Sequence, residues 1–169
     1  MKKTIIDRKF EKYLREEFAP AQLWADSDEG RKFIRDKIPS LDKLRSKEDA
    51  VLAACYGIWI NGNGVNCYTG QSLRTVRRLY VHAAHLFFEP EVYFGIRKEE
   101  IRSIEMKILT PPIFSKPARL AMEESLVRSL DPVLQPYANI PGMRYDTCLP
   151  RGQARRDAMI ARGVIGSDK

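Results

Sequence analysis

The middle of the chain carries four side chains whose types could together hydrolyse a phosphodiester: Tyr68, Arg78, His82 and Glu123. That chemistry needs a carboxylate for a metal ion, a cation for the charge that develops on phosphorus, and a group that takes a proton from water. Arg78 and His82 are four residues apart, so both point the same way if their segment is helical. Glu123 lies within an apolar helical pattern, from which it could aim into a cleft. Side chains of these types also occur together on ordinary solvent-exposed helix faces, where they have no catalytic role.

Local patterns predict the elements that would position these side chains. Residues 61–64 give a strong Asn-Gly turn signal between two β-prone segments at 56–60 and 65–69, which indicates a hairpin. Ser72 can cap a helix over 73–87. The other predicted elements are a strand at 103–109, a further strand candidate at 91–97, and helices at 4–18 (ended by Pro20), 28–37, 115–130 and 151–162. This order, helices followed by ββαβα and a basic tail, predicts an α+β fold, a mixed α/β layer.

Length and composition exclude several classes of protein. The chain has 169 residues, 44% of them apolar and 30% charged, which is typical of one globular domain. No apolar run reaches the ~18–20 residues that a membrane span needs. Charged residues at 7–9 interrupt the start of the chain before a signal sequence can form, so we expect a cytoplasmic protein. The three cysteines, without CxxC spacing, argue against a disulfide framework or a cysteine-based zinc site.

The charge balance favours polyanionic partners. Lys and Arg number 29 against 22 Asp and Glu, which gives a net charge of +7. Nucleic acid and anionic membranes both attract such a surface. The excess is most marked after residue 140, where arginines dominate, so this tail is either a solvated helix or a phosphate clamp.

The spacing of two glycine-containing motifs adds a resemblance. Gly57-Ile58-Trp59, followed after eight residues by Tyr68-Thr69-Gly70, resembles the paired signature of the GIY-YIG endonuclease superfamily. The family places an essential arginine eight residues after the second glycine, where Arg78 stands, and many members have a His or Tyr four residues later, where His82 stands.

The resemblance continues on the later helix and covers residues 56–139. The family has a helix with a metal-binding glutamate, and the run from Glu123 to Pro132 fits its pattern, with Glu124 as the rival carboxylate. A family asparagine follows a proline, and we favour Asn139 for this position because Pro136-Tyr-Ala-Asn139 keeps that ending; the distance from the helix would instead place Gln135 there.

The resemblance implies a three-stranded sheet with flanking helices, a nuclease core at 56–139, an N-terminal helical segment at 1–55 and a basic extension at 140–169. It further implies metal-dependent hydrolysis of DNA. Glu123 would hold Mg²⁺ or Mn²⁺, Arg78 would pair with the phosphate, and Asn139 or Gln135 would support the site.

One departure concerns the residue that prepares water. The tyrosine of the first motif is Trp59 here, and an indole cannot exchange a proton as a phenol does. The role would then fall to Tyr68, His82 or Tyr56. Gly57 and Gly70 would allow close approach of the backbone.

The overall layout most resembles compact restriction endonucleases of the superfamily, which can act as homodimers. The alternatives are a phage or mobile-element nuclease and a non-catalytic DNA-binding module. We expect DNA as the partner and no membrane association. The arginines expected to contact DNA are Arg74, Arg77, Arg151, Arg155 and Arg156.

Overall fold

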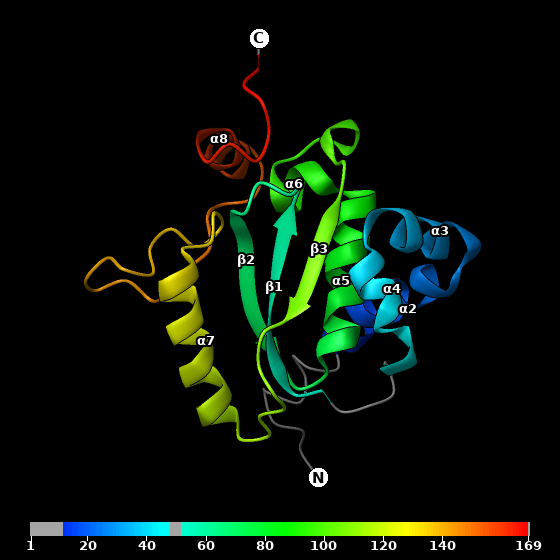
Figure 1. Cartoon of the computed structure of the whole chain (residues 1–169), viewed down its shortest axis with the longest axis horizontal. Coiled ribbons are helices and arrows are strands. Elements are labelled where there is room, and N and C mark those ends of the chain that lie inside the picture. Colours follow the sequence, from blue (N-terminus) through cyan, green and yellow to red (C-terminus); the bar gives the residue numbers. More distant parts are fainter. Residues whose placement is uncertain (1–11, 48–51, 169) are drawn as a thin grey trace.

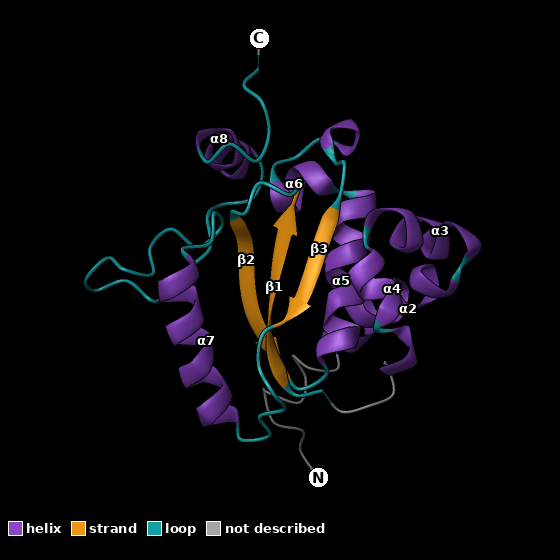
Figure 2. Ribbon diagram, in the orientation of Figure 1, coloured by secondary structure: helices purple, strands orange, loops and turns teal. Residues whose placement is uncertain are grey.

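The computed structural model describes residues 12–47 and 52–168, and in these residues one antiparallel sheet is flanked by helices (Figure 1). The strands are β1 (Ala54–Ile60), β2 (Asn66–Ser72) and β3 (Ile104–Ile108). The helical elements are η1 (Leu14–Phe18), α2 (Ala19–Asp26), α3 (Asp28–Lys37), α4 (Pro39–Lys43), η2 (Arg45–Lys47), α5 (Thr75–Phe88), α6 (Pro90–Phe94), η3 (Lys98–Glu100), α7 (Lys116–Leu130) and α8 (Gln153–Ala161). The combination confirms the predicted α+β class (Figure 2).

The sheet has the strand order β2-β1-β3, so β1 lies in the centre and pairs on both sides. The predicted hairpin is confirmed, and its two strands extend beyond the predicted segments. Its turn contains three residues in the left-handed region, Asn61, Gly62 and Gly64, which is why asparagine and glycine occur there. The pairing register shifts between Ile58 and Trp59, so a bulge lies close to the turn.

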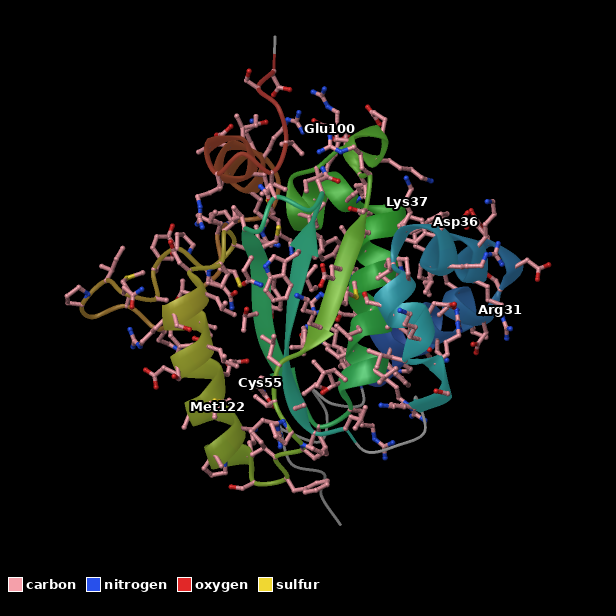
Figure 3. All side chains as sticks on the ribbon, in the orientation of Figure 1. Arg31, Asp36, Lys37, Cys55, Glu100 and Met122 are labelled. Atoms are coloured by element: carbon pink, nitrogen blue, oxygen red, sulfur yellow. The ribbon has the colours of Figure 1, made fainter. Side chains whose placement is uncertain are left out.

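The two faces of β1 meet different helices. Side chains alternate along a strand, so Tyr56, Ile58 and Ile60 share the face covered by α5, and all three are buried. Cys55 lies on the other face, where its thiol contacts the backbone of α7 (Figure 3). The sheet therefore separates α5 from α7, and β2 lies next to both helices.

The N-terminal helices cover the outer side of α5. There, α2 packs on α5, and Trp24 makes ring contacts with Phe33 and Phe87. The Ser27 hydroxyl accepts a hydrogen bond from the Gly30 N–H at 3.1 Å and so caps α3. At the other end of the chain, α8 packs against α6. None of the helices in the described segments has the length and hydropathy that crossing a membrane requires.

Three details of the predicted elements are wrong. Ser72 does not cap α5, because the helix begins at Thr75 with Arg74 in the N-cap position, and the Ser72 hydroxyl accepts from the Arg74 N–H instead. The segment 91–97 is not a strand: Pro90 starts the short helix α6, and Gly95, at φ 67°, ends it. Pro20 does not end the first helix, because it occupies the first turn of α2, where a proline is tolerated. Residues 4–11 of that predicted helix lie outside the described residues.

Candidate functional site

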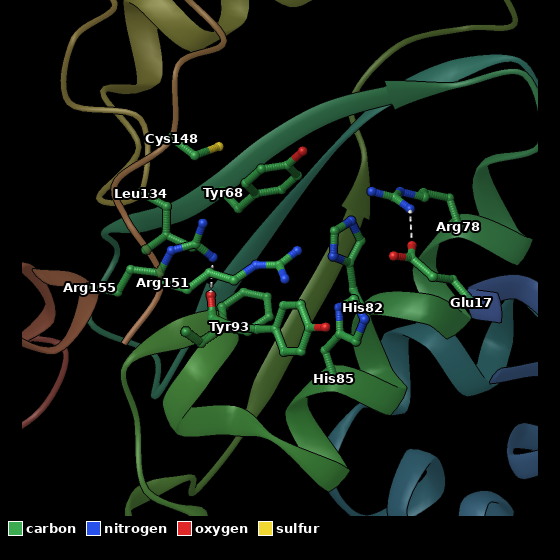
Figure 4. Close-up of a pocket in the computed structure, with 11 residues that line it drawn as sticks. Glu17, Tyr68, Arg78, His82, His85, Tyr93, Leu134, Cys148, Arg151 and Arg155 are labelled. Atoms are coloured by element: carbon green, nitrogen blue, oxygen red, sulfur yellow. Dashed lines mark hydrogen bonds and ion pairs between the residues drawn. The ribbon is translucent and has the colours of Figure 1, made fainter. Parts of the chain in front are cut away.

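Three of the four predicted catalytic side chains meet in one cavity of about 210 Å³. Tyr68 comes from β2, and Arg78 and His82 come from successive turns of α5 (Figure 4). Tyr68 pairs opposite Ile58 in the sheet, which directs its ring to the α5 side. Arg151 and Arg155, two of the arginines expected to contact DNA, line the same cavity. The cavity is therefore rich in cations and phenols.

A third ring, Tyr56 on β1, completes the aromatic cluster below Tyr68. The Tyr56 hydroxyl lies 2.8 Å from His82 Nε2, and the Tyr68 and His82 ring centroids are 5.1 Å apart. Tyr56 also explains the second motif glycine. Tyr56 and Gly70 are paired across the sheet, and a Cβ on Gly70 would lie 2.8 Å from the Tyr56 hydroxyl oxygen. Glycine at this position lets the Tyr56 ring reach His82.

Burial keeps this cluster uncharged apart from its arginine. Burial, together with the charge of Arg78, holds the pKa of His82 well below its usual value, so the imidazole is neutral at neutral pH. Burial also raises the pKa of Tyr56 and of Tyr68. A neutral imidazole has one nitrogen that can accept a proton, and an arginine remains charged. The cavity thus combines a proton acceptor with a fixed cation.

The N-terminal segment also reaches into this cavity, and no pattern in the sequence predicts that contact. Glu17 lies 3.7 Å from the Arg78 guanidinium as an ion pair. The Tyr13 ring lies under the same guanidinium, 5.4 Å from ring centroid to Cζ. Both residues belong to a segment more than 50 positions away in the chain, so only the fold brings them to Arg78.

Glu123 lies on α7, which the sheet separates from α5, and is not among the side chains that line this cavity. It is 8% exposed on α7, which packs along β2. Its Oε1 accepts a hydrogen bond from the Tyr145 hydroxyl at 2.7 Å. Burial raises the pKa of Cys148 in the cavity wall; Arg155 opposes that shift, and the charges of Asp146 and Glu123 add to it, so the Glu123 carboxylate is near that wall. The rival Glu124 is half-buried and pairs with Arg128 at 2.8 Å.

The Glu123 carboxylate is the kind of oxygen ligand that hard divalent cations bind. Burial raises its pKa, while the hydrogen bond from Tyr145 opposes that shift, so a cation would stabilise a carboxylate that the fold leaves poorly solvated. In the described segments, no three His, Cys, Asp or Glu side chains form a metal-binding group. A Mg²⁺ ion at Glu123 would therefore take most of its ligands from water and substrate oxygens, which is common for this ion.

The two amide candidates occupy different places. Gln135 is buried and forms two hydrogen bonds with the backbone of Thr69: its Oε1 accepts from the N–H at 3.0 Å, and its Nε2 donates to the carbonyl at 2.7 Å. Gln135 thus continues the pairing of residues 133 and 134 along the free edge of β2. Asn139 is exposed and donates to the Arg128 carbonyl at 3.1 Å, at the end of α7. Of the two, Gln135 is the amide that supports the strand carrying Tyr68.

Gly57 and Trp59 of the first motif lie on the other face of the sheet. A Cβ on Gly57 would lie 2.7 Å from the Trp59 ring, so the indole folds back over this glycine. Trp59 is half-buried, and the Lys107 ammonium lies 5.1 Å from its ring centroid. Because side chains alternate along β1, Trp59 faces away from Tyr56 and His82.

The arginines expected to contact DNA differ in their surroundings. Arg151 lies over the Tyr93 ring at 4.5 Å, and that ring stacks on His85 at 3.6 Å between centroids. Arg155 donates to the backbone carbonyls of Tyr93 and Leu149 at the cavity wall. Arg74 and Arg77 line a separate cavity, at the start of α5.

The Arg156 side chain is held by ion pairs within the fold. It is 7% exposed and pairs with Glu100 at 2.8 Å and with Asp168 at 2.6 Å. This double ion pair joins α8 to η3 and to the end of the described chain, so its guanidinium is already occupied within the fold.

Comparisons with protein-family models, with curated proteins and with solved structures give no match for this chain, so the resemblance to the GIY-YIG superfamily rests on the residues and spacings described above.

Proposed function

We propose that this protein is a metal-dependent endonuclease that hydrolyses phosphodiester bonds in DNA. The observation that carries the proposal is the cavity in which Tyr68, Arg78 and His82 meet beside Arg151 and Arg155. Charged, hydrogen-bonding and proton-accepting groups there match the needs of an attacked phosphate. The spacing of the motif residues supports the same chemistry.

In the proposed mechanism, Arg78 pairs with the scissile phosphate and stabilises the charge that develops on it. Tyr68 orients the attacking water, and the neutral His82 accepts its proton, directly or through Tyr56. The new bond joins the water oxygen to phosphorus, and the bond to the 3′ oxygen breaks. Glu123 would hold Mg²⁺ or Mn²⁺, which would neutralise the phosphate and stabilise the leaving oxygen.

Gln135 takes the supporting role in this proposal, because it is the amide that fixes the backbone next to Tyr68. Arg156 is left out of the DNA surface, since its carboxylate partners already hold it. We further propose a cytoplasmic restriction-type enzyme acting on duplex sites, as a homodimer or by successive nicking.

Cleavage of supercoiled plasmid and unmodified phage DNA tests the activity. The protein would be assayed with Mg²⁺, Mn²⁺ or EDTA, beside Arg78→Ala and the control Arg35→Ala, which removes an exposed arginine on α3. We expect metal-dependent discrete fragments that Arg78→Ala abolishes and Arg35→Ala retains. Nicking or smearing with the same dependence would replace the restriction role by a mobile-element or degradative one. Salt-sensitive DNA binding without any cleavage would overturn the nuclease and leave a binding module.

A further inference from the structure

A second cavity adjoins the candidate site and shares Arg78 with it. Its volume is about 300 Å³. It lies where the N-terminal segment meets the start of α5, and its wall includes Tyr13, Phe18, Leu73, Arg74, Arg77 and Arg78. The reaction proposed above uses only Arg78 of these residues.

Among the described residues, the lining combines flat apolar surfaces with cations. The guanidinium of Arg77 lies 5.4 Å from the centroid of the Phe18 ring, as that of Arg78 does from Tyr13. Leu73, which precedes α5, is 51% exposed beside them. Aromatic rings and stacked arginines together bind nucleobases, while the same arginines attract phosphate.

The size and position restrict the ligand further. A cavity of about 300 Å³ is at the lower end of small-molecule sites, so it suits one nucleotide and not a base pair. Because Arg78 lines both cavities, a strand whose scissile phosphate pairs with Arg78 brings its adjoining nucleotide to the second cavity. A base can enter only if it is unpaired, since a paired base stays stacked in the duplex.

We propose that this second cavity binds one unpaired nucleotide next to the scissile phosphate, and that the preferred substrate is DNA with an unpaired nucleotide at the cut, such as a flap, a mismatch or a single-stranded junction. The inference rests on the proposed nuclease function, and it names the substrate class. It would replace the restriction-type role on intact duplex sites, proposed above, by the phage or mobile-element alternative.

Binding of matched oligonucleotides tests this directly. Glu123→Gln, without metal, would be titrated with a fully paired duplex and with the same duplex carrying a flap of one nucleotide. We expect the flap to bind about tenfold more tightly, the size of one base–aromatic stack. In this background, Phe18→Leu removes the ring but keeps an apolar side chain, and Arg74→Gln removes an exposed charge. Each should reduce the preference for the flap to about threefold or less, as each removes part of that stack or its cation.

Arg151→Gln is the matched control, because it removes an arginine from the other cavity. It should weaken both complexes by the same factor and preserve the ratio. Thermal unfolding of each variant checks the fold. Equal affinity for both DNAs, or a preference unchanged in Phe18→Leu and Arg74→Gln, would overturn the proposal. A preference without cleavage by the wild-type protein in Mg²⁺ would instead overturn the nuclease function alone, and cleavage without a preference would overturn the unpaired-nucleotide site alone.

Discussion

Replacing Gln135 by methionine should destabilise the protein strongly, because one side chain satisfies two buried backbone groups. Methionine has a similar length but cannot hydrogen-bond, so both the N–H and the carbonyl of Thr69 lose their partner. Thr69 is fully buried. An unpaired buried group costs about 1–3 kcal/mol, so the expected loss is about 2–4 kcal/mol. For a chain of this size that corresponds to about 5–15 °C in melting temperature.

Asn139→Leu is the comparison that makes this prediction specific. Asn139 donates one exposed hydrogen bond, so its loss should cost about 0.5–1 kcal/mol, or ~1–4 °C. Thermal unfolding followed by circular dichroism measures both variants, and DNA cleavage should fall more in Gln135→Met because Tyr68 precedes Thr69 on β2. Equal melting temperatures for the two variants, or a larger loss in Asn139→Leu, would refute the assignment of the supporting amide to Gln135.

Three further predictions follow. Glu17→Gln should raise DNA affinity about twofold to fivefold in a binding titration, because a partly exposed ion pair that competes for Arg78 is worth up to about 1 kcal/mol; an unchanged or lower affinity would contradict this. Arg156→Gln should lower the melting temperature by several degrees with little change in DNA affinity, and Arg151→Gln should do the reverse; a loss of binding in Arg156→Gln would restore it to the DNA surface. The pKa of His82 is lower in the folded protein than its usual 6.5, so the unfolded chain binds its proton first. Its contribution to stability is therefore complete above about pH 6.5 and is lost as the pH falls below that value, and melting temperatures between pH 8 and pH 5 should fall less steeply in His82→Gln than in the wild type.

The sequence was sufficient for the parts of the site that depend on local pattern. The turn at Asn61 and Gly62 defines the hairpin, and the helical repeat directs Arg78 and His82 to the same face of α5. These features follow from short-range geometry, namely turn chemistry, strand alternation and the helical repeat. No long-range information is needed to predict them.

Features that depend on tertiary contacts could not be predicted in the same way. Asp131 adopts a left-handed conformation at the end of α7, and the chain then runs along the edge of β2, which brings Gln135 and not Asn139 to Thr69. Charge counting could not distinguish Arg156, held by two carboxylates, from an arginine at the surface.

The other missed contacts to the site come from distant loops and segments. Tyr145 reaches Glu123 from the loop that precedes α8, and Tyr13 reaches Arg78 from the N-terminal segment. No motif or periodicity in the sequence marks either tyrosine as a neighbour of the site, because both contacts form only when distant segments pack together.

The most direct test of the account is a parallel measurement of DNA binding and single-turnover cleavage in Glu123→Gln and Glu124→Gln. The two neighbouring glutamates differ in burial, and glutamine at 123 still offers an oxygen to the Tyr145 hydroxyl. We predict that Glu123→Gln keeps its DNA affinity and loses about a hundredfold or more in cleavage rate, because a metal ligand is removed, while Glu124→Gln behaves as the wild type. Wild-type cleavage by Glu123→Gln, or an equal loss in Glu124→Gln, would contradict the claim that Glu123 holds the catalytic metal.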